Sequence, residues 1–146
     1  MKNVMQQIVN YFDQAYNMEV KFSAYATGFT GSVVDSKIIY RSEELEAVSI
    51  VWEDDGNFNM FSVTVMMGEL EMSDQTRQYL NAYNIATYGW KAIVGTGTPY
   101  LAFKCEFEYV NPDKIQHILG LAFSELCSED NEVEFYDLVS KQLKKQ

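Results

Sequence analysis

Hydrophobic and polar positions along the chain follow two periods, and the change of period marks the predicted elements. Over the first 17 residues Val4, Ile8 and Phe12 recur at helical spacing, which predicts an amphipathic helix. From residue 19 the period falls to two, because Val20 and Phe22 alternate with polar neighbours as in a half-buried strand. The glycines of the following ATGFTGS segment break that alternation.

The middle of the chain reads as two strands joined by a tight turn. A strand is predicted from 46 to 53, DDGN at 54–57 is a strong turn signal, and a long strand follows over 58–72. Between these strands and the ATGFTGS segment, SVVDSKIIY reads as another strand or an irregular edge, and RSEELE as a helical turn.

The second half begins with a helix and a hairpin. Ser73 caps a helix that runs through TRQYLNAYN, and strands follow at about 90–95 and 99–109. One face of the second strand carries a regular apolar series: Leu101, Phe103, Cys105, Phe107 and Tyr109. Asn111-Pro112 then opens a helix with an apolar stripe from Ile115 to Leu126.

This order of elements predicts an α+β fold. We expect an antiparallel sheet of about five strands with an N-terminal helix, a middle helix and C-terminal helices. We expect residues 1–146 to form a single domain, with a helical extension over 128–146.

The charge balance narrows the classes of partner. The formal net charge is -10, with 11 basic and 21 acidic residues, which disfavours nucleic acid and anionic membrane surfaces as partners. A basic protein partner is compatible with this charge. The chain has no apolar run of membrane-spanning length and no signal-peptide pattern, so we expect a cytoplasmic protein.

The residues most suggestive of chemistry have simpler explanations. In GTGTP, residues 95–99, the glycines are followed by a strand and not by a helix, which favours a strand corner over a phosphate loop. His117 is predicted to face solvent, and Cys105 and Cys127 to be reduced, mostly buried thiols. We therefore expect no catalytic residue, no metal site and no cofactor.

Two acidic clusters are candidate metal or catalytic sites. Neither the cluster of Glu53, Asp54 and Asp55 nor the cluster of Glu129, Asp130 and Glu132 has the alternating spacing of a calcium loop. Turn chemistry explains the first cluster, and charge at a helix N-terminus explains the second.

A concentration of methionine and aromatic residues is the best candidate for an interface. Both faces of the long strand become apolar near Met66 and Met67, and a sheet covered on one face only should expose some of these side chains. The predicted protein interface consists of Phe58, Met60, Phe61, Met66 and Met67.

The segment 80–126, LNAYNIATYGWKAIVGTGTPYLAFKCEFEYVNPDKIQHILGLAFSEL, resembles the YbjN-like family of bacterial sensory transduction regulators. The Leu80-Asn81 pair, Asn84 at a helix end, two strands and an amphipathic helix carry this resemblance. The whole order is also similar to that of type III secretion chaperones. The resemblance implies a small, often dimeric, non-enzymatic domain; Asn81 and Asn84 are interpreted as helix-ending residues.

Three functions remain open from the sequence. The leading hypothesis is a non-enzymatic protein-interaction module, chaperone-like or regulatory, that acts as a homodimer. The alternative is a small-molecule binding domain with an apolar cavity between sheet and helices, lined by Trp52, Phe61, Trp90 and Phe103. The third is a hydrolase that uses paired carboxylates, for which no pair stands out.

Overall fold

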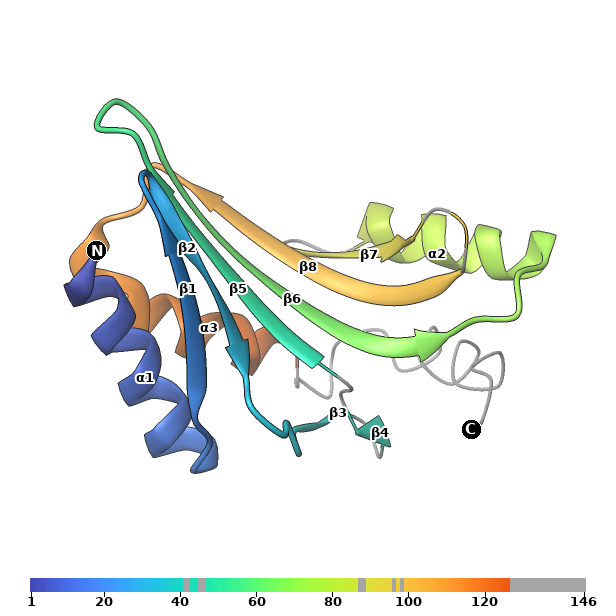
Figure 1. Ribbon diagram of the computed structural model, residues 1–146. Helices are drawn as coiled ribbons and strands as arrows, with labels where there is room; N and C mark the ends of the chain where they lie inside the picture. Colours follow the sequence, from blue (N-terminus) through green and yellow to red (C-terminus); the bar gives the residue numbers. More distant parts are fainter. Residues whose placement is uncertain (41–42, 45–46, 87–88, 96, 98, 127–146) are drawn as a thin grey trace.

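A six-stranded antiparallel sheet lies at the centre of the molecule in the computed structural model (Figure 1). The structure describes residues 1–146 except 41–42, 45–46, 87–88, 96, 98 and 127–146. The helices are α1 (Lys2–Tyr16), α2 (Asp74–Ala86), the 3-10 turn η1 (Pro112–Lys114) and α3 (Ile115–Leu126). The strands of the sheet, in spatial order, are β1 (Val20–Tyr25), β2 (Gly28–Val33), β5 (Ala47–Asp54), β6 (Asn59–Glu69), β8 (Tyr100–Glu108) and β7 (Trp90–Val94).

The predicted α+β class with an antiparallel sheet is confirmed, and the additional strand is β2. This strand occupies much of the glycine-containing segment that was expected to break the pattern. A Cβ at Gly28 would overlap the carbonyl oxygen of Trp52, and a Cβ at Gly31 would press on the ring of Phe22 at 3.1 Å. The two glycines therefore permit close approach of neighbouring strands and side chains, and they do not interrupt the sheet.

The segment between β2 and β5 differs from its prediction. Asp35 has a left-handed backbone with φ of 49°, and it lies in the turn after β2. A two-stranded ladder of β3 (Ile39–Tyr40) and β4 (Glu43–Glu44) follows. The described part of RSEELE is thus a short strand and not a helical turn; the other residues of that segment lie outside the described residues.

The hydrophobic core lies between the inner face of the sheet and helices α1 and α3. Before residue 66 the odd-numbered residues of β6 face inward, and Phe61, Val63 and Val65 are all fully buried. From the helices, Phe12 meets Phe123 edge to face with ring centroids 5.8 Å apart. Burial of each such side chain contributes roughly 1.5–3 kcal/mol, which makes this interface the main source of stability.

Strand β6 carries an irregularity near its end. Its register with β8 shifts between Met66 and Gly68, and Gly68 has φ of 147°. An extra residue on one strand bends it and increases its twist. Figure 1 shows the curvature of β6 and β8 on the side where α2 lies.

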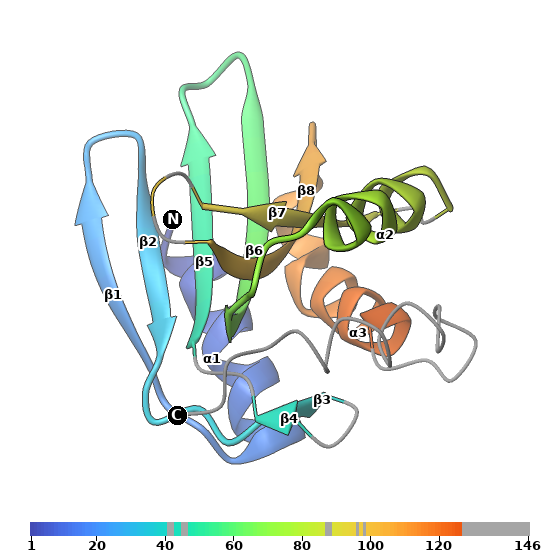
Figure 2. The same ribbon diagram turned by 90° about the vertical axis from the view of Figure 1, so that its right-hand side faces the viewer.

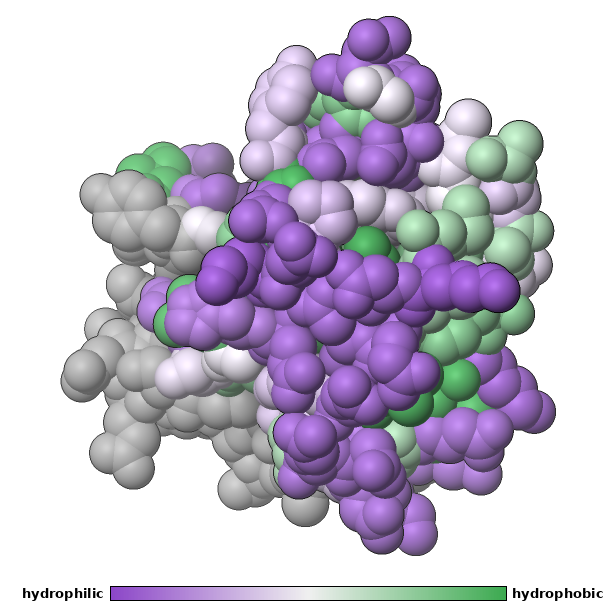
Figure 3. Space-filling model, turned by 90° about the vertical axis from the view of Figure 1, so that its left-hand side faces the viewer, coloured by the Kyte–Doolittle hydropathy of each residue, from purple (hydrophilic) through white to green (hydrophobic). Residues whose placement is uncertain are grey.

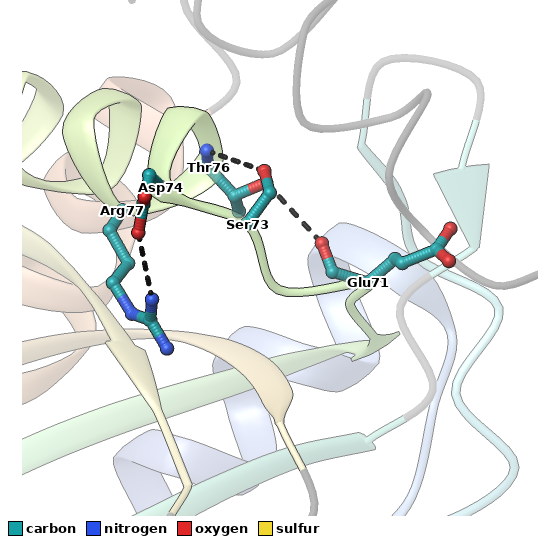
Figure 4. A network of polar contacts seen from close by, with 5 residues as sticks. All are labelled: Glu71, Ser73, Asp74, Thr76 and Arg77. Atoms are coloured by element: carbon teal, nitrogen blue, oxygen red, sulfur yellow. Dashed lines mark hydrogen bonds and ion pairs between the residues drawn. The ribbon is translucent and has the colours of Figure 1, made fainter.

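Helix α2 begins as predicted. Ser73 Oγ accepts from the backbone N–H of Thr76 at 3.1 Å, and Thr76 Oγ1 donates in turn to the carbonyl of Glu71 at 3.3 Å (Figure 4). Asp74 pairs with Arg77 at 3.3 Å on the exposed side. The buried hydroxyl of Thr76 therefore ties the end of β6 to the first turn of the helix.

The predicted cap at Asn111 begins the turn η1, which leads directly into α3, because Asn111 Oδ1 accepts from the N–H of Asp113 at 3.0 Å. The side chain of Gln7 in α1 forms hydrogen bonds with the same region. It donates to Pro112 O at 2.6 Å and accepts from the N–H of Gln116 at 3.1 Å. These bonds fix α1 against α3. No described helix is long and apolar enough to cross a membrane.

Candidate functional site: the outer face and the edges of the sheet

The outer face of the sheet, opposite α1 and α3, is organised in cross-strand rows. One row is polar and runs across all six strands: Lys21, Ser32, Ser49, Thr64, Lys104 and Lys91. The next row on this face, two residues further along β6, is apolar. In it Met66 lies opposite Ala102, and Ala102 lies opposite Ile93. We call Met66, Ala102 and Ile93 the apolar row; Ile93 is 42% exposed.

The five residues of the predicted interface divide between the two faces. Phe61 is 0% exposed and Met67 is 6% exposed, since both share the inward phase of Val63 and Val65. These two residues belong to the core and are not available to a partner. Met66 is half-buried on the outer face, and Phe58 and Met60 are half-buried beside the turn that joins β5 to β6.

The end of that hairpin carries a small aromatic contact. The rings of Phe58 and Tyr109 meet edge to face with centroids 5.2 Å apart, and Tyr109 is 73% exposed. Tyr109 was predicted to continue the inner face of β8, but the strand ends at Glu108 and Tyr109 has φ of 52°. The side-chain amide of Asn59 holds this exit, donating to Val110 O at 2.9 Å and accepting from Val110 N–H at 2.6 Å.

The acidic cluster in the turn between β5 and β6 has the structural role predicted for it. Asp54 accepts from the N–H of Gly56 at 2.9 Å, and Asp55 accepts from the N–H groups of Asn57 and Phe58. These backbone bonds lower the pKa of Asp55 below its ordinary value. Glu53 instead accepts from the hydroxyl of Tyr25 at 2.7 Å. The second acidic cluster, at 129–132, lies outside the described residues.

The other residues considered for chemistry are placed as expected. His117 is exposed on α3. Cys105 is buried, and desolvation, with a smaller contribution from Glu125, raises the pKa of its thiol to about 11. Gly97 has φ of 92° and lies between β7 and β8, where a strand corner was predicted. Cys127 lies outside the described residues.

The aromatic residues proposed to line a ligand cavity fill the core instead. Trp52, Phe61, Trp90 and Phe103 are each at most 2% exposed. Trp90 also donates its indole N–H to Ala122 O at 2.7 Å, and Phe103 packs against Tyr83 with ring centroids 5.4 Å apart. A hollow of about 780 Å³ is present elsewhere, between the end of α1 and the segment after β2, and none of these four residues lines it.

At the β7 edge of the sheet, Asn84 has a role that differs from the predicted one. Asn84 lies inside α2 and does not end it. Its side chain accepts from the N–H of Ala92 at 2.7 Å and donates to Ala92 O at 2.9 Å, as a neighbouring strand would. Lys91 Nζ also reaches the carbonyl of Asn84 at 2.7 Å. Asn81, the other position of the motif, is exposed.

A sequence signal for this role existed. Asn is a weak helix former, so an Asn in the interior of an amphipathic helix indicates a tertiary function for its amide. The choice of partner strand, however, depends on the packing of α2 along β7, and sequence spacing alone does not supply it.

Comparison with known proteins gives one structural similarity. No family model matches the chain, and no curated protein matches it. Among solved structures, the chain is similar to the crystal structure of YbjN from E. coli, described as "a putative transcription regulator", with 14% identity and a TM-score of 0.49. The similarity covers 97% of this chain and 96% of that chain. The solved protein bears the family name that the resemblance of segment 80–126 suggested.

Proposed function

We propose that this protein is a non-enzymatic protein-interaction module, chaperone-like or regulatory, that works in the cytoplasm as a homodimer. The observation that carries the proposal is the apolar row on the outer face. α1 and α3 cover the inner face and α2 follows the β7 edge, so Met66 and Ile93 remain accessible. Apolar side chains in register on a sheet face that no described helix covers are typical of an interaction surface.

Charge on the same face favours a basic partner. Glu53 and Glu108 flank Met60 from the neighbouring strands, and Glu106 lies opposite Ser62. Lys104 offsets part of this charge through its contact with Glu106 at 3.8 Å. With the net charge of -10, these carboxylates would steer a basic protein toward the face, while the apolar row would supply contact area.

The test compares two isoleucine-to-glutamate variants in a co-purification experiment with the protein as bait. Ile93→Glu places a charge in the apolar row, whereas Ile85→Glu makes the same change on α2, where Ile85 is 78% exposed. We expect Ile93→Glu to lose a protein captured by the unmodified bait, and Ile85→Glu to retain it. The captured protein is then purified and its Kd is measured with both variants.

Two results would contradict the proposal. One is a captured protein that binds both variants with the same Kd, since its site would then lie away from the outer face. The other is the absence of any saturable binding by the unmodified protein. Circular dichroism of both variants controls for loss of fold.

A further inference from the structure

Strand β1 forms an edge of the sheet that no described element covers. It pairs with β2 on one side and is the last strand in the order. Figure 2 shows β1 at the margin of the sheet with no described element beyond it. Edge strands of natural proteins are usually protected by prolines, bulges, several charges or a covering segment. β1 has a regular register with β2, contains no proline and carries one charge, that of Lys21.

The register identifies the backbone groups that face outward. Val34 N–H donates to Glu19 O at 2.8 Å, which continues the β1–β2 pairing by one residue. Because hydrogen-bonded and non-hydrogen-bonded pairs alternate in an antiparallel ladder, Lys21 and Ser23 share the phase of Glu19 and bond to β2. The N–H and C=O groups of Phe22 and Ala24 consequently point away from the sheet.

The surface around these groups is apolar. Phe22 is half-buried against the ring of Phe29, with centroids 5.2 Å apart, and Ala24 is exposed. Figure 3 views the molecule from the α1 side and shows a mainly hydrophilic centre with a hydrophobic strip along its right-hand margin, where β1 lies in that view. The edge thus combines outward-facing backbone groups with apolar side chains.

We propose that β1 is the homodimer interface, with a second copy of this chain pairing antiparallel to it about a two-fold axis at Ser23. The two sheets then become one continuous sheet. Phe22 bonds through its backbone to the partner's Ala24, and the reciprocal pair repeats the arrangement. Phe22 and Ala24 also complement each other as a large and a small side chain on the inner face.

Charge selects this register. Lys21 is placed opposite the partner's Tyr25 in a close, non-hydrogen-bonded pair, where its ammonium can lie over the ring. The hydroxyl of each Tyr25 is bonded to Glu53, so each lysine also approaches a carboxylate. Moving the axis to Lys21 would bring two lysines together, and moving it to Phe22 would bring Glu19 toward the Tyr25–Glu53 pair. A slip by one residue would reverse the faces of the second sheet.

This inference rests on the proposed function, which includes a homodimer, and it adds the surface through which the dimer forms. β1 contains no acidic residue, which suits self-association of a chain with a net charge of -10. The apolar row on the outer face stays open in such a dimer, and Glu53 lies where the partner surface and the dimer contact meet.

The first test removes one outward N–H. In Ala24→Pro the lost donor faces away from β2, and proline is tolerated on that side of an edge strand. We expect the dimer dissociation constant, measured by sedimentation equilibrium, to rise at least about a hundredfold, because both copies lose a backbone bond. Hydrogen exchange of the unmodified protein provides a second measurement: the amides of Phe22 and Ala24 should become more protected as concentration rises.

The second test reverses charges and does not alter the backbone. We expect Lys21→Glu to weaken the dimer about tenfold, since two symmetric contacts become repulsive. The double variant Lys21→Glu with Glu53→Lys should associate more tightly than either single variant. Lys114→Glu, which changes the net charge equally at an exposed position on η1, is the matched control and should leave association unchanged.

The outcomes separate this inference from the proposed function. A dimer that survives Ala24→Pro, with Phe22 and Ala24 amides that exchange equally at all concentrations, overturns the β1 interface and leaves a homodimer that uses another surface. A monomer at every concentration overturns both the interface and the homodimer. An edge occupied only by a basic protein, with the chain itself monomeric, also overturns the inference while the interaction function stands.

Discussion

The two edges of the sheet differ in how their backbone groups are satisfied. At β7, the amide of Asn84 bonds both backbone groups of Ala92, and α2 lies alongside. At β1, no described element replaces the missing neighbour. Since an open edge is a template for another strand, protection of the β7 edge alone leaves a single direction in which the sheet can be extended.

The largest expected effect comes from a substitution that disturbs the pairing of β2 with β5, through which the open edge is attached to the rest of the sheet. In Gly28→Ala the new Cβ would overlap the carbonyl of Trp52, which is backbone and cannot rotate away. We expect the free energy of unfolding to fall by about 3 kcal/mol, as for severe overpacking. Urea denaturation measures the change.

Gly120→Ala is the matched control for this variant. Gly120 lies in α3 with open space around its Cα, so the substitution should stabilise the protein by about 0.5–1 kcal/mol. Equal destabilisation by both substitutions would show that the close approach of β2 to β5 is not what Gly28 provides.

A second change opens the closed edge. Asn84→Ala removes two hydrogen bonds and leaves the backbone of Ala92 without its partner, which should cost about 2–3 kcal/mol. Asn81→Ala alters an exposed residue of the same helix and should change stability by less than about 0.5 kcal/mol. The denaturation midpoint of Asn84→Ala should be clearly lower than that of Asn81→Ala. Similar midpoints would contradict the role of Asn84 at the β7 edge.

The smallest effect concerns the side-chain bond at the open edge. Tyr25→Phe removes a bond to Glu53 between exposed groups, and we expect a loss of about 0.5 kcal/mol or less. The Glu53 bond is the main cause that raises the pKa of Tyr25 above its ordinary value of 10.0. A raised pKa favours the protonated hydroxyl in the folded state, so the contribution is complete below pH 10 and is lost as pH rises through the raised value.

The measurement is the difference in unfolding free energy between the unmodified protein and Tyr25→Phe from pH 8 to 11. The difference should shrink above about pH 10. A difference that grows in that range would reverse the sign of the linkage and contradict the bond.

The periodic parts of the fold were predictable from sequence, and the close contacts were not. The caps at Ser73 and Asn111 were found because each uses a side chain within three residues of its acceptor or donor. Gly28 was misread, since a glycine that breaks a strand and one that permits close approach look alike until the neighbouring Trp52 is placed.

The candidate interface shows the same limit. Met66 was predicted to be accessible and lies on the outer face, whereas Phe61 and Met67 were predicted as interface residues because the prediction rested on the apolar strand 58–67 as a whole. The alternation along β6 separates the two sets once the inner face is known from Val63 and Val65. The apolar row itself depends on pairing with Ala102 and Ile93, which are distant in sequence.

Two asparagine side chains, each bonded through both its NH₂ group and its oxygen to the backbone of one residue, make the protein sensitive to deamidation. Asn59 and Asn84 each present a donor and an acceptor to a single residue. Deamidation would convert either side chain to a carboxylate, which accepts but does not donate, and would set a negative charge against the carbonyl of Val110 or Ala92. Deamidation of Asn84 would therefore remove its hydrogen bond to the carbonyl of Ala92 and weaken the protection of the β7 edge. A deamidated sample would then expose a second edge strand to which another strand could bind.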